Sequence, residues 1–416
     1  MVERIFYGWW IVLANFTIVF YVGGTVFYGF TAFFEPMVAE FAWSYTQISL
    51  ASSIRGLEMG LMAPVIGFLA DRFGSRKLLF IGIIVLGAGN ILLGFTQSLL
   101  MFYGCFVLIA FGAGGCTSVV TLTAVANWFD KNVGKAMGVM ASGFGASGLL
   151  VPVIVWLIGT YGWRTTAIIL GVGMWIIGLP MAGIVRNKPE DYGYYPDGEK
   201  PEDGHKQAYE GDAFRADMRF KEVLKKRAFL FVNLSETIRL MTLTAVITHI
   251  MPYLSTVHFS RANAGLVAAS IPLLSVIGRF GFGWLGDLIE KKHAMVAAFS
   301  LMGLGALCLS YITEDVLLYI FIIFFSVGYG GLSVLRGAFL REYYGREFFG
   351  RLIGIMMGFG AGGGVIGPTA AGWVFDRTGS YHLVWLVFAG LIGMAILLLL
   401  AVDSKTEPRS YPTSEA

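Results

Sequence analysis

Long apolar runs separated by short polar clusters dominate this chain. Within each run the apolar residues are continuous and do not alternate with polar ones. A helix needs about 20 apolar residues to cross a bilayer, whereas a lipid-facing β-strand is shorter and alternates. The pattern therefore predicts an all-α integral membrane protein and excludes a β-barrel. We expect twelve transmembrane helices, at 9–32, 46–70, 79–97, 100–127, 135–159, 165–186, 227–257, 264–288, 294–313, 315–340, 351–376 and 381–402.

One long hydrophilic stretch, 187–226, interrupts the apolar runs near the middle of the chain. Its proline, glycine and mixed charges are typical of a linker, with a short amphipathic helix expected near 214–226. It divides the chain into two pseudo-symmetric six-helix halves, 1–186 and 227–402. The polar segment 403–416 forms a tail.

The two halves also repeat in sequence with an offset of 216 residues, as 283 − 67 = 216 shows for the glycines that open two similar loops. Other residues at this offset are the pairs Pro36 and Pro252, Asp71 and Asp287, Gly138 and Gly354, and Pro152 and Pro368. An internal duplication of this kind is common in transporters.

Composition agrees with a membrane protein, because 56% of residues are hydrophobic and only 14% are charged. A soluble protein carries about 25% charged residues. Cations gather in the links after even-numbered helices, at Arg72, Arg76, Lys77, Lys131, Lys135, Lys291, Lys292, Arg341, Arg346 and Arg351. The positive-inside rule therefore predicts a multi-pass protein of the cytoplasmic membrane, with both termini and the linker in the cytoplasm.

The loop Gly67-Phe-Leu-Ala-Asp71-Arg72-Phe-Gly74-Ser-Arg76-Lys77 resembles the signature loop of the major facilitator superfamily. Its echo at 283–293, the six-plus-six layout and the long central loop extend this resemblance over nearly the whole chain. The resemblance implies that the loop residues Gly67, Asp71, Arg72, Gly74 and Arg76, with Asp287 in the echo, form a conformational latch. In relatives the aspartate faces a helix N-terminus in the other half, where negative charge is favoured, and here helix 11 is the expected partner.

Several shorter segments resemble one branch of that superfamily, the monocarboxylate transporters and oxalate/formate antiporters. They are Tyr7-Gly-Trp-Trp10, Asn127-Trp-Phe-Asp-Lys131, Tyr161-Gly-Trp-Arg164, Gly278-Arg279-Phe-Gly281 and Gly372-Trp-Val-Phe-Asp-Arg-Thr-Gly-Ser-Tyr381. Drug/proton antiporters carry a different glycine pattern in helix 5, which Gly148-Leu-Leu-Val-Pro152 lacks.

Arg279 is the candidate substrate anchor. Eight residues separate it from Asp287, so a helical rise places it about 12 Å from the end of helix 8. No acid lies one turn away, and its repeat mate at 279 − 216 = 63 is an alanine. A planar guanidinium suits a carboxylate ligand, although a salt bridge to another helix would also explain it. The resemblance favours the ligand, since that branch uses a helix 8 arginine here.

Two charge pairs on single helices, Glu236 with Arg239 and Arg55 with Glu58, are candidates for proton coupling or gating, or simple structural pairs. His249 could bind substrate or carry the coupled proton, because histidine changes charge near physiological pH; it could equally form a hydrogen bond to the helix break at Pro252.

A tyrosine offers a polar hydroxyl on an apolar ring. The candidate pathway tyrosines are Tyr28, Tyr253 and Tyr329, with Tyr28 and Tyr329 in the substrate site.

Two differences from the monocarboxylate and oxalate/formate branch bear on the substrate and on the proton site that we expect. Oxalate-type members use a helix 11 lysine as a second cation, and 351–376 contains no lysine, which favours a monoanion. Animal monocarboxylate carriers place an aspartate one turn before the arginine, where this chain has Ser275, so the proton site stays open.

The sequence thus predicts a secondary active transporter of small monocarboxylates such as lactate or pyruvate, coupled to protons by alternating access. A carboxylate/carboxylate exchanger is the first alternative, and efflux of drugs or hydrophobic solutes is the second. A sensor or a membrane enzyme is disfavoured, because no catalytic set, metal cluster, phosphate-binding loop or signalling domain is evident. We expect no cofactor, no metal and no nucleic-acid partner, and a monomer in the lipid bilayer.

Overall fold

The architecture comes from a computed structural model of the chain, which describes residues 6–117, 119–129, 132–198, 223–312, 315–344 and 349–402. These residues form helices and no strand, which confirms the all-α prediction. The tail 403–416 and most of the helix expected near 214–226 lie outside the described residues.

The first half begins with one long helical stretch that changes its winding three times. It consists of α1 (Tyr7–Val22), the π-helical η1 (Gly23–Tyr28), the 3₁₀-helical η2 (Gly29–Phe33) and α2 (Phe34–Phe41). The rest of this half comprises α3 (Tyr45–Phe73), α4 (Ser75–Gly94), α5 (Leu99–Cys116), α6 (Val119–Ala126), α7 (Val133–Ala146), η3 (Ser147–Leu149) and α8 (Leu150–Ile184).

The second half follows two short 3₁₀ turns, η4 (Glu190–Tyr192) and η5 (Pro196–Gly198). It comprises α10 (Arg227–Thr256), α11 (Arg261–Leu288), α12 (Lys291–Ser310), α13 (Asp315–Tyr344), α14 (Phe349–Thr378) and α15 (His382–Leu400).

Ten helical stretches of the described residues are long and apolar enough to cross a membrane, against the twelve spans predicted. One difference arises because Lys135–Ile184 joins two predicted spans into one stretch. Gly162 breaks that stretch with φ +78°, a left-handed conformation that glycine adopts without strain. The other difference is α3, which coincides with the predicted span 46–70 but is not among the ten. Several side chains of α3 lie outside the described residues, so its absence from the ten does not count against the predicted span.

The break at Gly162 lies within the segment Tyr161–Arg164, one of those that resemble the monocarboxylate transporter branch. Glu40 accepts hydrogen bonds from Trp163 Nε1 at 2.6 Å and from Arg164 Nη2 at 2.7 Å. Arg164 Nη1 donates to the carbonyls of Gly94 and Thr96. The Tyr161–Arg164 segment therefore ties the end of α2 and the end of α4 to the start of the second part of α8.

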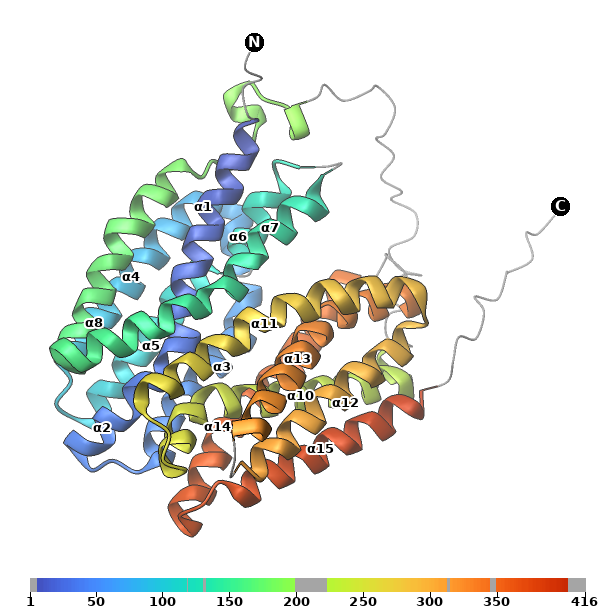
Figure 1. Cartoon of the computed structure of the whole chain (residues 1–416). Helices are drawn as coiled ribbons and strands as arrows, with labels where there is room; N and C mark the ends of the chain where they lie inside the picture. Colours follow the sequence, from blue (N-terminus) through green and yellow to red (C-terminus); the bar gives the residue numbers. More distant parts are fainter. Residues whose placement is uncertain are drawn as a thin grey trace.

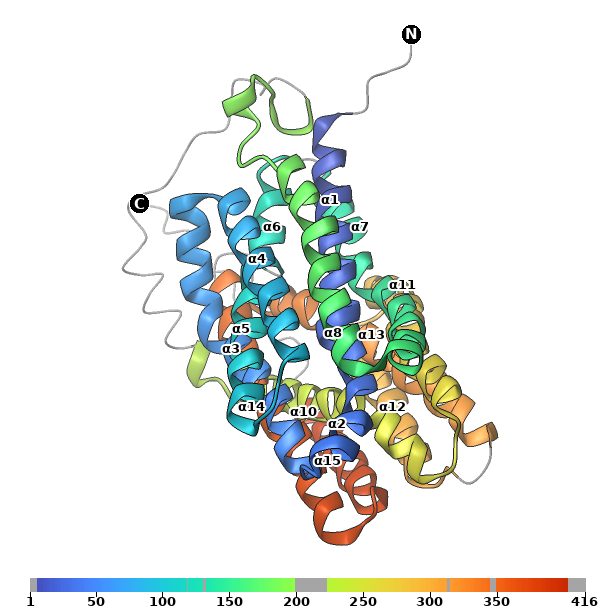
Figure 2. The same cartoon turned by 90° about the vertical axis from the view of Figure 1, so that its left-hand side faces the viewer.

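The two halves meet at one end of the molecule, which we call the closed end, where α3 begins and α14 ends. There Ser53 Oγ lies 2.6 Å from Thr369 Oγ1, and Gly56 lies against the backbone of Gly364. A second line of contact joins α11 to the α7–α8 stretch, where Gly148 lies against Ala269 and Pro272. Figure 1 shows the two groups of helices converging near α2 and α14 and spreading toward the end that carries the N-terminus. Figure 2 shows the same meeting of α3 with α14 from the side.

Candidate functional site

Arg279 lies half-buried on α11 where that helix faces α7. Its Nη1 donates to the carbonyl of Ala141 at 3.3 Å, and its Nε is buried without a hydrogen-bond partner. Gly145 makes room for it, because a side chain there would press on Val276 and approach the guanidinium. Within the described part of the chain no carboxylate forms an ion pair with Arg279. The salt bridge considered as the alternative is therefore not seen there.

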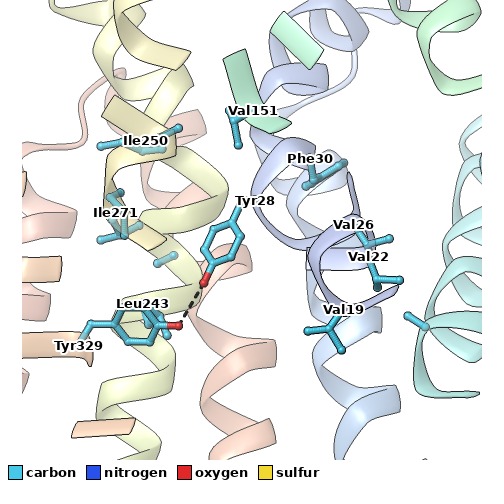
Figure 3. Close-up of a cluster of buried hydrophobic side chains, with 14 of the residues drawn as sticks. Val19, Val22, Val26, Tyr28, Phe30, Val151, Leu243, Ile250, Ile271 and Tyr329 are labelled. Carbon is cyan, nitrogen blue, oxygen red and sulfur yellow. Dashed lines mark hydrogen bonds between the residues drawn. The ribbon is translucent and has the colours of Figure 1, made fainter. Parts of the chain in front are cut away.

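Tyr28 and Tyr329 meet between the two halves, with their hydroxyl oxygens 3.1 Å apart. Both are buried, at 2% and 5% exposure. Figure 3 shows the two rings pointing toward one another, with Leu243, Ile250 and Ile271 from the second half around them. Tyr28 comes from the π-helical turn of η1, and Tyr329 from α13. The pair is a polar contact surrounded by apolar side chains.

The position of Tyr329 on α13 depends on close approach of two helices. A side chain at Gly330 would lie 2.0 Å from the carbonyl oxygen of Ser275, and one at Gly278 would lie 2.1 Å from that of Val327. Such distances leave no space for a Cβ, so α11 and α13 touch backbone to backbone. This contact fixes Arg279 and Tyr329 on adjoining helices.

Glu236 and Arg239 form the predicted pair on α10, but a third charge joins them. Arg239 donates to the Glu236 carboxylate through Nε at 2.7 Å and through Nη2 at 2.5 Å. Arg336, on α13, donates to Glu236 Oε1 through Nη1 at 2.7 Å. Glu236 and Arg239 are almost fully buried, and the Arg336 side chain is 20% exposed. Reasoning from pairs on one helix missed Arg336, although its place in the predicted span 315–340, seven residues after Tyr329, was a signal.

His249 joins three helices at the closed end. Its Nε2 lies 2.9 Å from both Ser49 Oγ of α3 and the carbonyl oxygen of Pro368 of α14. Its Nδ1 lies 2.8 Å from the Tyr381 hydroxyl. A carbonyl only accepts, so these partners fit a neutral ring that is protonated at Nε2 and accepts at Nδ1 from Tyr381. Tyr253, by contrast, donates to the Leu309 carbonyl of α12 at 2.5 Å, within its own half.

Asp376 provides a contact that the sequence reasoning did not assign. It lies near the end of α14 and accepts hydrogen bonds from the backbone N–H groups of Tyr45 and Thr46, at 2.9 Å and 2.8 Å. These are the first two residues of α3, where the helix dipole favours a negative charge. The 216-residue repeat gave no signal for it, because the residue that corresponds to Asp376 in the first half is Thr160.

The signature loop itself is described in part. The side chains of Arg55, Glu58 and Asp71, and the surroundings of Gly67, lie outside the described residues, although the backbone of all four belongs to α3. Gly74 ends that helix with φ +82°. The backbone N–H of Arg76 donates to Asn187 Oδ1 at 3.0 Å, and its Nη2 donates to the Gly183 carbonyl at 3.2 Å, so the loop is held to the end of α8. Arg72 and Asp287 are exposed.

The structure thus places a half-buried guanidinium without a carboxylate partner in the described residues on α11, two facing tyrosines between the halves, and a buried cluster of three charges on α10 and α13. Of the predicted site residues, Arg279, Tyr28 and Tyr329 lie on elements that adjoin between the halves, whereas His249 lies apart at the closed end. Within the described residues no group of three or more histidine, cysteine, aspartate or glutamate side chains is placed to hold a metal ion. The arrangement suits binding of a small anion rather than bond-making chemistry.

A family model described as Major Facilitator Superfamily matches residues 13–257 and 232–416. An uncharacterized MFS-type transporter of Bacillus subtilis, YcxA, is 27% identical over 399 residues, covering 94% of each chain. Monocarboxylate transporter 12 of Xenopus laevis is 26% identical over 411 residues, covering 95% of this chain and 88% of that protein. Among solved structures, a bacterial homolog of the human lysosomal transporter Spinster has a TM-score of 0.71 at 16% identity, covering 96% of this chain and 95% of that one.

Proposed function

This chain belongs to the major facilitator superfamily and is a multi-pass membrane transporter, and from that premise we propose that it carries small monocarboxylates, such as lactate or pyruvate, together with a proton. The observation that carries the proposal is Arg279, a guanidinium inside a membrane helix with no carboxylate partner in the described residues. The similarity to monocarboxylate transporter 12, whose name states its substrate class, supports it.

Arg279 is the proposed anchor for the substrate carboxylate. Its Nε is buried and unpaired, and its Nη1 makes one long hydrogen bond. A carboxylate would accept two parallel hydrogen bonds from such a fork, which a lysine cannot offer. Tyr28 and Tyr329 would close the pocket on the α13 side, where either hydroxyl can turn to a second substrate oxygen.

His249 is the proposed proton carrier. It connects the halves through Ser49 and Pro368, so a change in its charge bears directly on the contact between α3 and α14. The alternative carrier is the pair Glu236 and Arg239, but that carboxylate already accepts hydrogen bonds from two arginines. A proton that travels with the anion makes the transported pair neutral, so loading adds no net charge that would have to be enclosed in a low dielectric.

Alternating access would act between the six-helix halves 1–186 and 227–402, with 187–226 as the linker. The contacts at the closed end support a state that opens toward the other end. With both termini in the cytoplasm, as the distribution of cations suggests, the closed end faces the exterior and this state faces inward. In such a state substrate would leave to the cytoplasm, on the side of the Arg239 and Arg336 cluster.

The test is uptake of radiolabelled lactate into proteoliposomes with an acidic exterior. Loss of a hydrogen-bonded charge costs about 1.5–3 kcal/mol, so Arg279→Ala should reduce uptake roughly 10- to 100-fold. Arg279→Lys should retain only part of the activity because it keeps the charge and loses the fork. Arg377→Ala, at an exposed arginine stacked over Trp373, is the matched control. An Arg279→Ala carrier with normal uptake contradicts the proposal.

A carboxylate/carboxylate exchanger remains the second candidate, favoured by the neutral hydrogen-bonding of His249, which needs no proton in this state. Uptake driven by internal carboxylate and insensitive to the pH difference would identify it.

A further inference from the structure

The three-charge cluster of Glu236, Arg239 and Arg336 has more positive charge than a structural pair requires. Glu236 and Arg239 alone are neutral and joined by two hydrogen bonds. Arg336 adds a second guanidinium, and arginine stays protonated in proteins. The cluster therefore holds one carboxylate and two cations, and the described residues supply no further acid to it.

The hydrogen bonds of the cluster are also incomplete. Arg239 uses Nε and Nη2 on Glu236, while its Nη1 is buried and has no partner in the described part of the chain. That side chain is 2% exposed, so water does not cover it. Within the described residues Arg336 makes one hydrogen bond, from Nη1 to Glu236, and its side chain is one-fifth exposed. A buried guanidinium with unmet N–H groups and surplus charge favours an anionic ligand with acceptor oxygens or a halide.

The cluster adjoins the tyrosine pair. Both include a residue of α13, Tyr329 in the pair and Arg336 in the cluster. Arg336 follows Tyr329 by seven residues on α13, which puts both on one face of that helix. Glu236 lies ten residues into α10 from Arg227, toward the end of the helix opposite the closed end.

We infer that Arg239 and Arg336, arranged around Glu236, form a second binding position for a small monoanion, distinct from Arg279. The ligand is either the carboxylate of a substrate molecule or chloride, and both share the same chemistry of a single negative charge bound by guanidinium N–H groups. The carboxylate form of this inference rests on the proposed function, while the chloride form does not. Glu236 acts as a built-in competitor, because it occupies donors that the anion would otherwise take.

The test is a thermal unfolding titration of the purified chain with sodium lactate and, separately, with sodium chloride. An anion that binds only the folded state raises the unfolding temperature with a midpoint set by its Kd. All measurements are made in an Arg279→Ala background, so that the Arg279 position does not contribute. Arg377→Gln in the same background is the control for a lost surface cation.

The charges of the cluster predict opposite results for two substitutions. Arg336→Gln leaves a neutral pair and should raise the apparent Kd at least tenfold, whereas Glu236→Gln removes the competitor and should lower it about tenfold. If the cluster were only a structural salt bridge, both substitutions would lower the unfolding temperature without anion, and neither would change its anion dependence. Arg336→Lys keeps the charge and should keep the binding, which separates misfolding from loss of the site.

The two anions identify the source of the ligand. A shift with lactate alone assigns the position to substrate, a shift with chloride alone assigns it to the halide, and a shift with each shows that the position accepts either anion. The inference is overturned if neither anion stabilises the Arg279→Ala protein, or if Arg336→Gln leaves the titration unchanged. Failure of the proposed function would appear separately, as normal lactate uptake by Arg279→Ala, and would leave the chloride titration valid.

Discussion

The Asp376 carboxylate accepts two hydrogen bonds from Thr46, one from its backbone N–H at 2.8 Å and another from its hydroxyl at 2.5 Å. The two residues are 330 positions apart and belong to opposite halves of the molecule. Their contact places a negative charge on the first turn of α3, where the helix dipole is positive. It is the counterpart, at the closed end, of the contact expected of Asp71 with the start of α14.

We predict that Asp376→Asn weakens the closed end without unfolding either half. Charge at a helix N-terminus contributes about 0.3–1 kcal/mol, and up to about 2 kcal/mol in partly buried geometry, so the closed state should lose roughly two- to thirtyfold in population relative to the opposite one. Spin labels on cysteines at Thr160 and Ser380, both exposed near the closed end, report the distance between the halves. The variant should gain a longer distance.

Arg377→Gln serves as the control, because Arg377 is adjacent, exposed and stacked on Trp373 rather than on the other half. An Asp376→Asn protein with an unchanged distance distribution would show that this contact does not hold the closed end together.

Substitution of two glycines can distinguish an effect on conformation from an effect on stability. Gly363 packs α14 against α10, and Gly56 packs α3 against α14. A Cβ at Gly363 would lie 2.1 Å from the Thr237 carbonyl oxygen, inside one half, whereas one at Gly56 would lie 3.1 Å from Gly364, between halves. We predict that Gly363→Ala lowers the unfolding temperature, with overpacking costing about 1–3 kcal/mol. Gly56→Ala should instead shift the same spin-label distances with little change in unfolding temperature. Identical effects of the two substitutions would contradict this division.

The sequence predicted the helical segments well because an apolar run of membrane length admits one secondary structure. Of the site, it found Arg279, since a charge in an apolar run is conspicuous. It missed Arg336 and Asp376 for a common reason. Their partners, Glu236 and Thr46, lie on other helices, and spacing along one helix carries no information about contacts between helices 100 or 330 residues apart.

The change from α-helix to π-helix and then to 3₁₀-helix around Tyr28 could not be predicted from the sequence either. Gly23 and Gly24 lie against Ser147 and Leu150 of the neighbouring helical stretch, where a side chain would clash. The π-helical turn of η1 and the following 3₁₀ turn shift the register of the chain, and so turn Tyr28 toward Tyr329. An apolar pattern gives no hint of such a turn, because apolar residues suit all three kinds of helix in a membrane.

We predict that His249→Gln separates transport from proton coupling. Glutamine keeps a donor and an acceptor for Pro368 and Tyr381 but does not titrate at physiological pH. Tyr381 contacts His249 directly, at 2.8 Å from Nδ1. Lactate exchange should therefore persist, while net uptake loses its dependence on an acidic exterior.

The measurement compares pH-driven uptake with exchange in proteoliposomes of the same preparation. Ser49→Ala is the matched control, because it removes one hydrogen bond of His249 and leaves the imidazole. Normal pH-driven uptake by His249→Gln would assign the proton to another group.

We predict that Tyr329→Phe weakens substrate binding more than Tyr253→Phe does. The Tyr329 hydroxyl faces Tyr28 between the halves, while the Tyr253 hydroxyl is held by the Leu309 carbonyl inside one half. Loss of one neutral hydrogen bond costs about 0.5–1.5 kcal/mol, so KM for lactate should rise roughly two- to tenfold in Tyr329→Phe. Tyr253→Phe should lower the unfolding temperature and leave KM near its original value, because its partner is a structural carbonyl. The measurement is the KM for lactate uptake by both variants. If Tyr329→Phe and Tyr253→Phe have the same KM, the Tyr28–Tyr329 contact joins the halves without binding the substrate.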